Sequence, residues 1–149
     1  MADAPTRRQL AGRSVYFELL HTHDRLQGEF AQLFKQRGLT HAQFNVLRIL
    51  RGGGPDGLTC QQVGERLIHR LPDVTRLLDR MEAAKLVSRE RSPTDRRVVL
   101  VRLTAEGRRM VDDLDEPVLS LHERQVAHLT ARDLEELATL LARLRQRPE

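Results

Sequence analysis

The stretch from Val74 to Gly107, VTRLLDRMEAAKLVSRERSPTDRRVVLVRLTAEG, changes its hydrophobic period partway along, and this change decides the fold. Its first part has apolar residues at helical spacing, which predicts one apolar helix face made of Val74, Leu77, Leu78 and Met81. Further on, Val99, Val101 and Leu103 alternate with their neighbours, as in a strand. The turn between two short strands is the basic, Pro-containing segment 92–97. We therefore predict a helix, a β-hairpin with a basic tip, and the start of another helix.

The polar face of the predicted helix and the tip of the hairpin both carry arginine. The polar face holds Thr75, Arg76, Asp79 and Arg80. A helix fits the major groove of a DNA duplex, and a thin basic hairpin can reach a minor groove. The segment is therefore typical of a DNA-binding surface.

These residues resemble the MarR family of bacterial winged helix-turn-helix transcription regulators. The most specific part, DRRVVLVRLTAEG (Asp95–Gly107), is similar to the family's wing and the start of its fifth helix. LTHAQFNVLRIL (Leu39–Leu50) resembles its second helix, and LTCQQVGERL (Leu58–Leu67) resembles the first helix of its helix-turn-helix. The resemblance runs from about Val15 to about Leu144. It implies a mainly α fold with a small β-hairpin wing, about six helices, and a helical dimerisation region built from both termini.

On this basis we expect a single domain over residues 1–149, with dimerisation helices over 10–36 and 105–146. The winged helix-turn-helix would occupy residues 39–104. The end segments carry apolar residues at spacings of three and four, which favour a partner helix. These are Tyr16, Leu19, Leu20, Leu26, Phe30 and Leu33, then Val111, Leu114, Val118 and Leu121, and finally Leu134, Leu137, Leu141 and Leu144. Pro117 should bend the fifth helix. Packing within one chain remains the alternative.

Four helix starts have threonine where its hydroxyl can cap the first turn. They are Thr40, Thr59, Thr104 and Thr130, with Gln43 and Gln62 completing two capping boxes. The helix that contains Val74 is different, because Arg70, Leu71, Pro72 and Asp73 precede it. We expect Pro72 to be its first helical residue and Asp73 to lie in its first turn.

Composition limits the class of protein. The 149 residues carry a formal charge of +4, but residues 66–102 hold ten basic and five acidic side chains. This excess places the positive field where DNA phosphates would lie. One cysteine excludes an intrachain disulfide. No apolar run approaches about 18 residues and no signal-peptide core is present, so we expect a cytoplasmic protein without a membrane span.

The resemblance assigns roles within this surface. It implies that Arg97 enters a minor groove, with Asp95 orienting its guanidinium, while Arg96 contacts phosphate. Arg76 is the best candidate for contact with a base edge, and an intrahelical pair with Asp73 or Asp79 is the alternative. The full set of DNA-binding candidates is Arg70, Asp73, Thr75, Arg76, Arg80, Asp95, Arg96 and Arg97.

Two further features concern regulation. His23 interrupts the apolar stripe of the first helix, so it is either a hydrogen-bonded core histidine or a polar anchor in an effector pocket. Tyr16 and Arg25 could contribute to such a pocket, since the resemblance implies small aromatic or anionic ligands. Cys60 follows a helix cap, where a thiolate is favoured, but a small packed residue is the simpler interpretation.

The sequence thus predicts a homodimeric, ligand-responsive repressor that binds a pseudo-palindromic DNA site. The alternatives are a thiol-based redox sensor acting through Cys60 and a winged-helix protein-interaction module without DNA binding. An enzyme is not expected, because no nucleophile–base spacing, dinucleotide fingerprint or metal-ligand set is present. We expect no catalytic residues, no metal and no cofactor.

Overall fold

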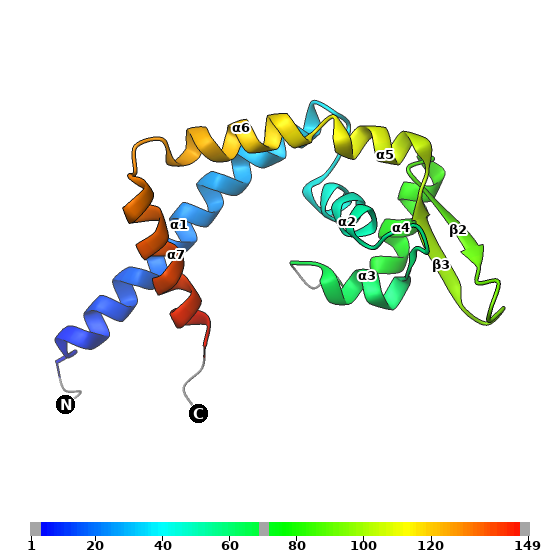
Figure 1. Ribbon diagram of the computed structural model, residues 1–149. Helices are drawn as coiled ribbons and strands as arrows, with labels where there is room; N and C mark the ends of the chain where they lie inside the picture. Colours follow the sequence, from blue (N-terminus) through cyan, green and yellow to red (C-terminus); the bar gives the residue numbers. More distant parts are fainter. Residues whose placement is uncertain (1–3, 69–71, 147–149) are drawn as a thin grey trace. The chain divides into compact units, whose positions relative to one another are not determined.

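The computed structural model describes residues 4–68 and 72–146 (Figure 1). The chain divides into two compact units, residues 1–115 and 116–149. The helices of the described residues are α1 (Arg7–Lys35), α2 (His41–Gly52), α3 (Cys60–Arg66), α4 (Val74–Ala83), α5 (Ala105–Asp112), α6 (Asp115–Val126) and α7 (Ala131–Arg145). The strands are β1 (Leu58–Thr59), β2 (Val87–Arg91) and β3 (Val99–Leu103). The predicted fold, mainly α with a small β-hairpin, is confirmed.

The predicted threonine caps are present at the starts of α2, α3, α5 and α7. In each case the threonine side chain accepts a hydrogen bond from the backbone N–H three residues on. Gln43 and Gln62 complete the capping boxes of α2 and α3, as predicted. Thr6 caps α1 in the same way, which the sequence analysis did not identify. Four local signals therefore located four helix starts correctly.

The start of α4 differs from the prediction by one position. Asp73 is the N-cap, and its carboxylate accepts a hydrogen bond from the backbone N–H of Arg76 at 2.9 Å. Pro72 precedes the cap and is not the first helical residue. The prediction was wrong because an aspartate satisfies one of the free N–H groups of the first turn, a stronger local preference than proline's tolerance there.

The three strands form an antiparallel sheet in the order β1–β3–β2. Val87 lies opposite Leu103 and Arg91 opposite Val99, so β2 and β3 make the predicted hairpin. Its tip extends beyond the neighbouring helices (Figure 1). The short strand β1, which pairs with β3 through Leu58 and Val101, was not predicted. Two residues are too few to produce the alternation by which a strand is recognised.

The core of the first unit includes the apolar face of α4 and, from the sheet, Val87 and Val101. The predicted apolar face of α4 is confirmed, because Leu77, Leu78 and Met81 are all buried. At the end of α1, Phe34 stacks on Phe44 of α2 with ring centroids 4.4 Å apart. Burial of this α4 face turns its polar side chains to solvent.

The predicted fifth helix is two helices. α5 ends at Asp112 and α6 begins at Asp115. The interruption lies four residues before Pro117 because proline cannot donate to the carbonyl of Asp113 and its ring clashes there. The expected bend is thus a break, and the described residues contain seven helices where about six were expected.

Arg51, in the last turn of α2, binds both sides of this break. Its guanidinium donates to Asp112 at 2.9 Å and to the two carboxylate oxygens of Asp115 at 2.8 and 2.7 Å. The hydrogen bond to Asp115 is the main reason that the pKa of Arg51 is raised. In turn, the hydrogen bond from Arg51 lowers the pKa of Asp115. One arginine therefore joins α2 to the end of α5 and to the first residue of α6.

We expect Arg51→Met to lower the free energy of unfolding by about 1 kcal/mol at pH 7, the upper range for partly exposed ion pairs. The pKa of Asp115 is lowered from its ordinary value of 3.8. Its stabilising contribution is therefore complete above that value and is lost as the pH falls through the lowered pKa. In urea denaturation, the difference between parent and variant should shrink as the pH falls from 3.8 through the lowered pKa of Asp115. Arg108→Met, at an exposed position of α5, is the control, and an equal loss there would contradict the assignment.

Several large apolar side chains are exposed in each unit. On α1 these are Leu10, Val15, Tyr16, Phe17, Leu19 and Leu20, and on the helices of the second unit they are Leu119, Leu137, Leu140 and Leu144. Of the predicted α7 seam, Leu137 and Leu144 are exposed while Leu134 and Leu141 are half-buried. Within residues 4–68 and 72–146, none of the helices combines the length and apolar character needed to cross a bilayer.

Candidate nucleic-acid interface

The polar side of α4 is exposed, as the sequence predicts. Thr75, Arg76, Asp79 and Arg80 all lie at the surface. The helix is held against α3, where Cys60 Sγ lies 3.7 Å from the Thr75 hydroxyl. Gly64 of α3 faces Val74, and a Cβ there would lie 3.3 Å from the Val74 side chain. α3 and α4 therefore lie close together, and the arginine-bearing face of α4 remains accessible to solvent.

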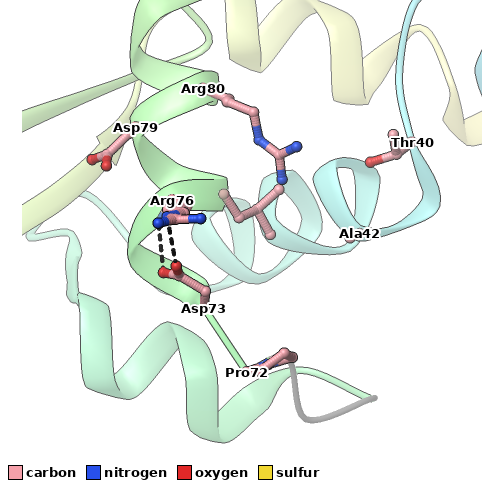
Figure 2. A pocket seen from close by; sticks show the side chains of 8 residues that line it. Thr40, Ala42, Pro72, Asp73, Arg76, Asp79 and Arg80 are labelled. Carbon is pink, nitrogen blue, oxygen red and sulfur yellow. Dashed lines mark hydrogen bonds and ion pairs between the residues drawn. The ribbon is translucent and has the colours of Figure 1, made fainter.

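Arg76 forms the intrahelical pair that the sequence analysis kept as its alternative. Its Nε lies 3.0 Å from Asp73 Oδ2, while the other carboxylate oxygen of Asp73 caps the helix (Figure 2). The Arg76 side chain is nevertheless 83% exposed. Its terminal nitrogens therefore remain accessible to a ligand.

Asp79, the other predicted partner of Arg76, binds Arg89 of β2. The Arg89 guanidinium also contacts Glu82 at 3.2 Å and donates to the backbone carbonyl of Thr75 at 3.3 Å. The hydrogen bond to Asp79 is the main cause of the raised pKa of Arg89. Arg89 therefore links the wing, which is the β2–β3 hairpin, to α4. From the sequence, Arg89 was only one of the ten basic residues of this region, although Asp79 and Glu82, three apart on one helix, were a signal for such a partner.

The turn of the wing is closed by hydrogen bonds of its own residues. Ser92 donates its backbone N–H to Val98 at 2.8 Å. Asp95 accepts a hydrogen bond from the backbone N–H of Arg97 at 2.9 Å. The carboxylate of Asp95 therefore fixes the backbone of the turn, whereas the family resemblance implied that it orients the guanidinium of Arg97. The side chains of Arg96 and Arg97 are exposed at the tip.

Ion pairs within this region compensate most of its negative charge. Asp73, Asp79, Glu82 and Glu90 each pair with an arginine. Arg80, Arg96 and Arg97 are exposed on α4 and the wing. The surface thus offers a positive field to an anionic ligand. Arg70, another predicted contact, lies outside the described residues.

A pocket of about 560 Å³ lies beside α4, against the start of α2 (Figure 2). It is lined by Thr40, Ala42, Pro72, Asp73, Arg76, Leu77, Asp79 and Arg80. The pocket therefore borders the arginine-bearing face of α4.

The predicted effector residues do not line this pocket. Tyr16, His23 and Arg25 lie on α1 and are exposed. His23 is 53% exposed and lies 3.7 Å from Asp24, so the interpretation of His23 as a core histidine is wrong within this chain. Thr22 and Asp24, beside it on α1, are also exposed.

Cys60 is a free, half-buried cysteine at the first position of α3. Its packing against Thr75 agrees with the simpler interpretation of a small packed residue. Among the described residues, no three histidine, cysteine, aspartate or glutamate side chains gather as metal ligands would.

Comparisons with known proteins agree with this geometry. The family model described as "MarR family" matches residues 37–98. A MarR transcription factor from Planctomyces limnophilus is 39% identical, with a TM-score of 0.68, over 95% of this chain and 98% of that one. A mutant MarR from E. coli, solved in complex with operator DNA, is 28% identical, with a TM-score of 0.74, over 97% of this chain and 100% of that one. The transcriptional repressor MdtR of Bacillus subtilis is 29% identical over 91% of this chain and 86% of its own length.

Proposed function

Because the chain belongs to the MarR family of winged helix-turn-helix transcription regulators, we propose that it binds duplex DNA sequence-specifically as a homodimer and represses transcription. The observation that carries the proposal is the exposure of Arg80 on α4 and of Arg96 and Arg97 on the wing. The acidic residues near them, Asp73, Asp79 and Glu90, are paired with Arg76, Arg89 and Arg102. A role as a protein-interaction module would not require this positive surface. Acting on chromosomal DNA, the protein would work in the cytoplasm.

In this proposal α4 enters the major groove and Arg97 reaches the adjacent minor groove, where a narrow groove concentrates negative potential. Thr75, Arg76 and Arg80 face the bases, and Arg96 contacts phosphate. The exposed apolar faces of α1 and α7 form the dimer, which sets the distance between the two copies of α4. Half-site centres would then lie about 10 base pairs apart.

Selection from random duplexes, followed by footprinting, tests the function directly. We expect a pseudo-palindromic site and an affinity that falls steeply with salt, with a log–log slope of about −0.9 per neutralised phosphate. A footprint over one unrepeated half-site would contradict the dimer. Absence of salt-dependent retention on any duplex would favour the protein-interaction module.

We further propose that a small aromatic or anionic effector releases the DNA by changing the distance between the two copies of α4. Support comes from Tyr16, His23 and Arg25, which present a phenol, an imidazole and a guanidinium on an exposed stretch of α1. Salicylate added to the DNA-binding assay, with parent and His23→Ala, measures this response. Thiol control through Cys60 is the alternative, and release by peroxide from parent but not from Cys60→Ser would establish it.

A further inference from the structure

We propose that Asp73 holds the Arg76 guanidinium in the orientation that reads a guanine, which makes Asp73 a specificity-determining residue of α4. The inference rests on the proposed DNA-binding function and deepens it. Asp73 acts through Arg76 and is therefore a positioning residue.

Both oxygens of the Asp73 carboxylate contact the same arginine, Arg76 (Figure 2). Oδ1 of Asp73 accepts the backbone N–H of Arg76 at 2.9 Å, and Oδ2 lies 3.0 Å from Arg76 Nε. Because the first contact is the helix cap, it fixes the plane of the carboxylate. The second oxygen is therefore held at one place, and it holds Nε.

The contact between Asp73 and Nε leaves the two terminal nitrogens of the Arg76 guanidinium accessible. Arginine has five N–H donors, four of them on its two terminal nitrogens, and at the end of the guanidinium one N–H of each terminal nitrogen points away from Nε. Two of them match the O6 and N7 acceptors of guanine in the major groove. Since the Arg76 side chain is 83% exposed, the surrounding protein does not block this approach.

The pair also changes what Arg76 can gain from DNA. An arginine that is already oriented loses less side-chain freedom when it binds, which favours the matching base. A guanidinium paired with a carboxylate has less net charge to offer a phosphate. Asp73 therefore shifts Arg76 from sequence-independent attraction toward base recognition.

Helix capping alone does not account for both contacts. Serine and asparagine are N-cap residues of similar strength, but only a carboxylate has a second anionic oxygen for Nε. Asp73→Asn and Asp73→Ser thus keep a capping oxygen and remove the contact with Arg76. These variants separate the start of α4 from the orientation of its arginine.

The experiment compares parent, Asp73→Asn, Asp73→Ser, Arg76→Ala and the double variant Asp73→Asn/Arg76→Ala. After selection from random duplexes, the affinity for a guanine over the other bases is measured at the position that Arg76→Ala alters. We expect Arg76→Ala to lose about tenfold to a hundredfold in this preference. Each Asp73 variant should lose about threefold to tenfold, and Asp73→Asn should lose nothing further in the Arg76→Ala background. A ratio of affinities does not depend on the active fraction of a preparation.

The outcomes separate the inference from the proposed function. Retention of the full guanine preference by both Asp73 variants, with its loss in Arg76→Ala, would overturn the inference and leave the function intact. An unchanged motif for Arg76→Ala would instead show that the assignment of the reading face is wrong. Asp113→Asn removes the same charge at an exposed position after α5, and an equal drop there would also overturn the inference.

Discussion

Leu137→Asp together with Leu144→Asp is expected to dissociate the proposed dimer and abolish specific DNA binding. Both leucines lie on α7, and they are 46% and 58% exposed within the chain. Replacing these two leucines should therefore remove little buried apolar surface from a single chain. In a two-fold dimer each substitution occurs twice and places unpaired carboxylates in an apolar contact, at a cost of several kcal/mol for each ion.

Sedimentation and DNA binding measure this effect. The dimer dissociation constant should rise by more than about a thousandfold, since every 1.4 kcal/mol is a factor of ten. Thr139→Asp is the matched control, because Thr139 lies on the opposite side of α7 from Leu137. Circular dichroism should report the same helix content in all variants. A double variant that still sediments as a dimer and binds the selected site would show that other surfaces form the dimer.

Arg97→Ala is expected to weaken binding to the selected site by about tenfold to a hundredfold, the range for a hydrogen bond to a charged group. The guanidinium lies at the exposed tip of the wing, and Asp95 fixes the backbone that carries it. The loss should be greatest where the base pairs beneath the wing are A·T-rich, because these narrow the minor groove. The salt slope should also fall by about one.

Exchange of the flanking A·T pairs for G·C pairs completes the test. The parent should lose affinity on this exchange, whereas Arg97→Ala should change little, because the contact is already absent. Arg8→Ala removes an exposed arginine from α1 and serves as the control. Equal sensitivity of parent and Arg97→Ala to the flanking sequence would place the wing away from the minor groove.

The sequence by itself determined the elements whose signals are local. Threonine caps located four helix starts, because a cap is satisfied within three residues of the chain. The helical period identified the buried face of α4, and the strand period identified the β2–β3 hairpin. Both signals arise because burying one side of a helix or strand requires apolar residues at the repeat of that element. The polar side of that period and the basic turn indicated a DNA-binding surface, and the roles of the residues in the wing were implied by the family resemblance.

Only the tertiary structure decided how the charged side chains pair. Asp79 was a possible partner of Arg76 by spacing, yet it binds Arg89, which lies ten residues further along the chain on β2. Arg51 meets Asp112 and Asp115 across more than sixty residues, and no local pattern encodes that distance. The strand β1 exists only because β3 passes beside it. Long charged side chains reach several partners at similar cost, so the packing of whole elements selects among them.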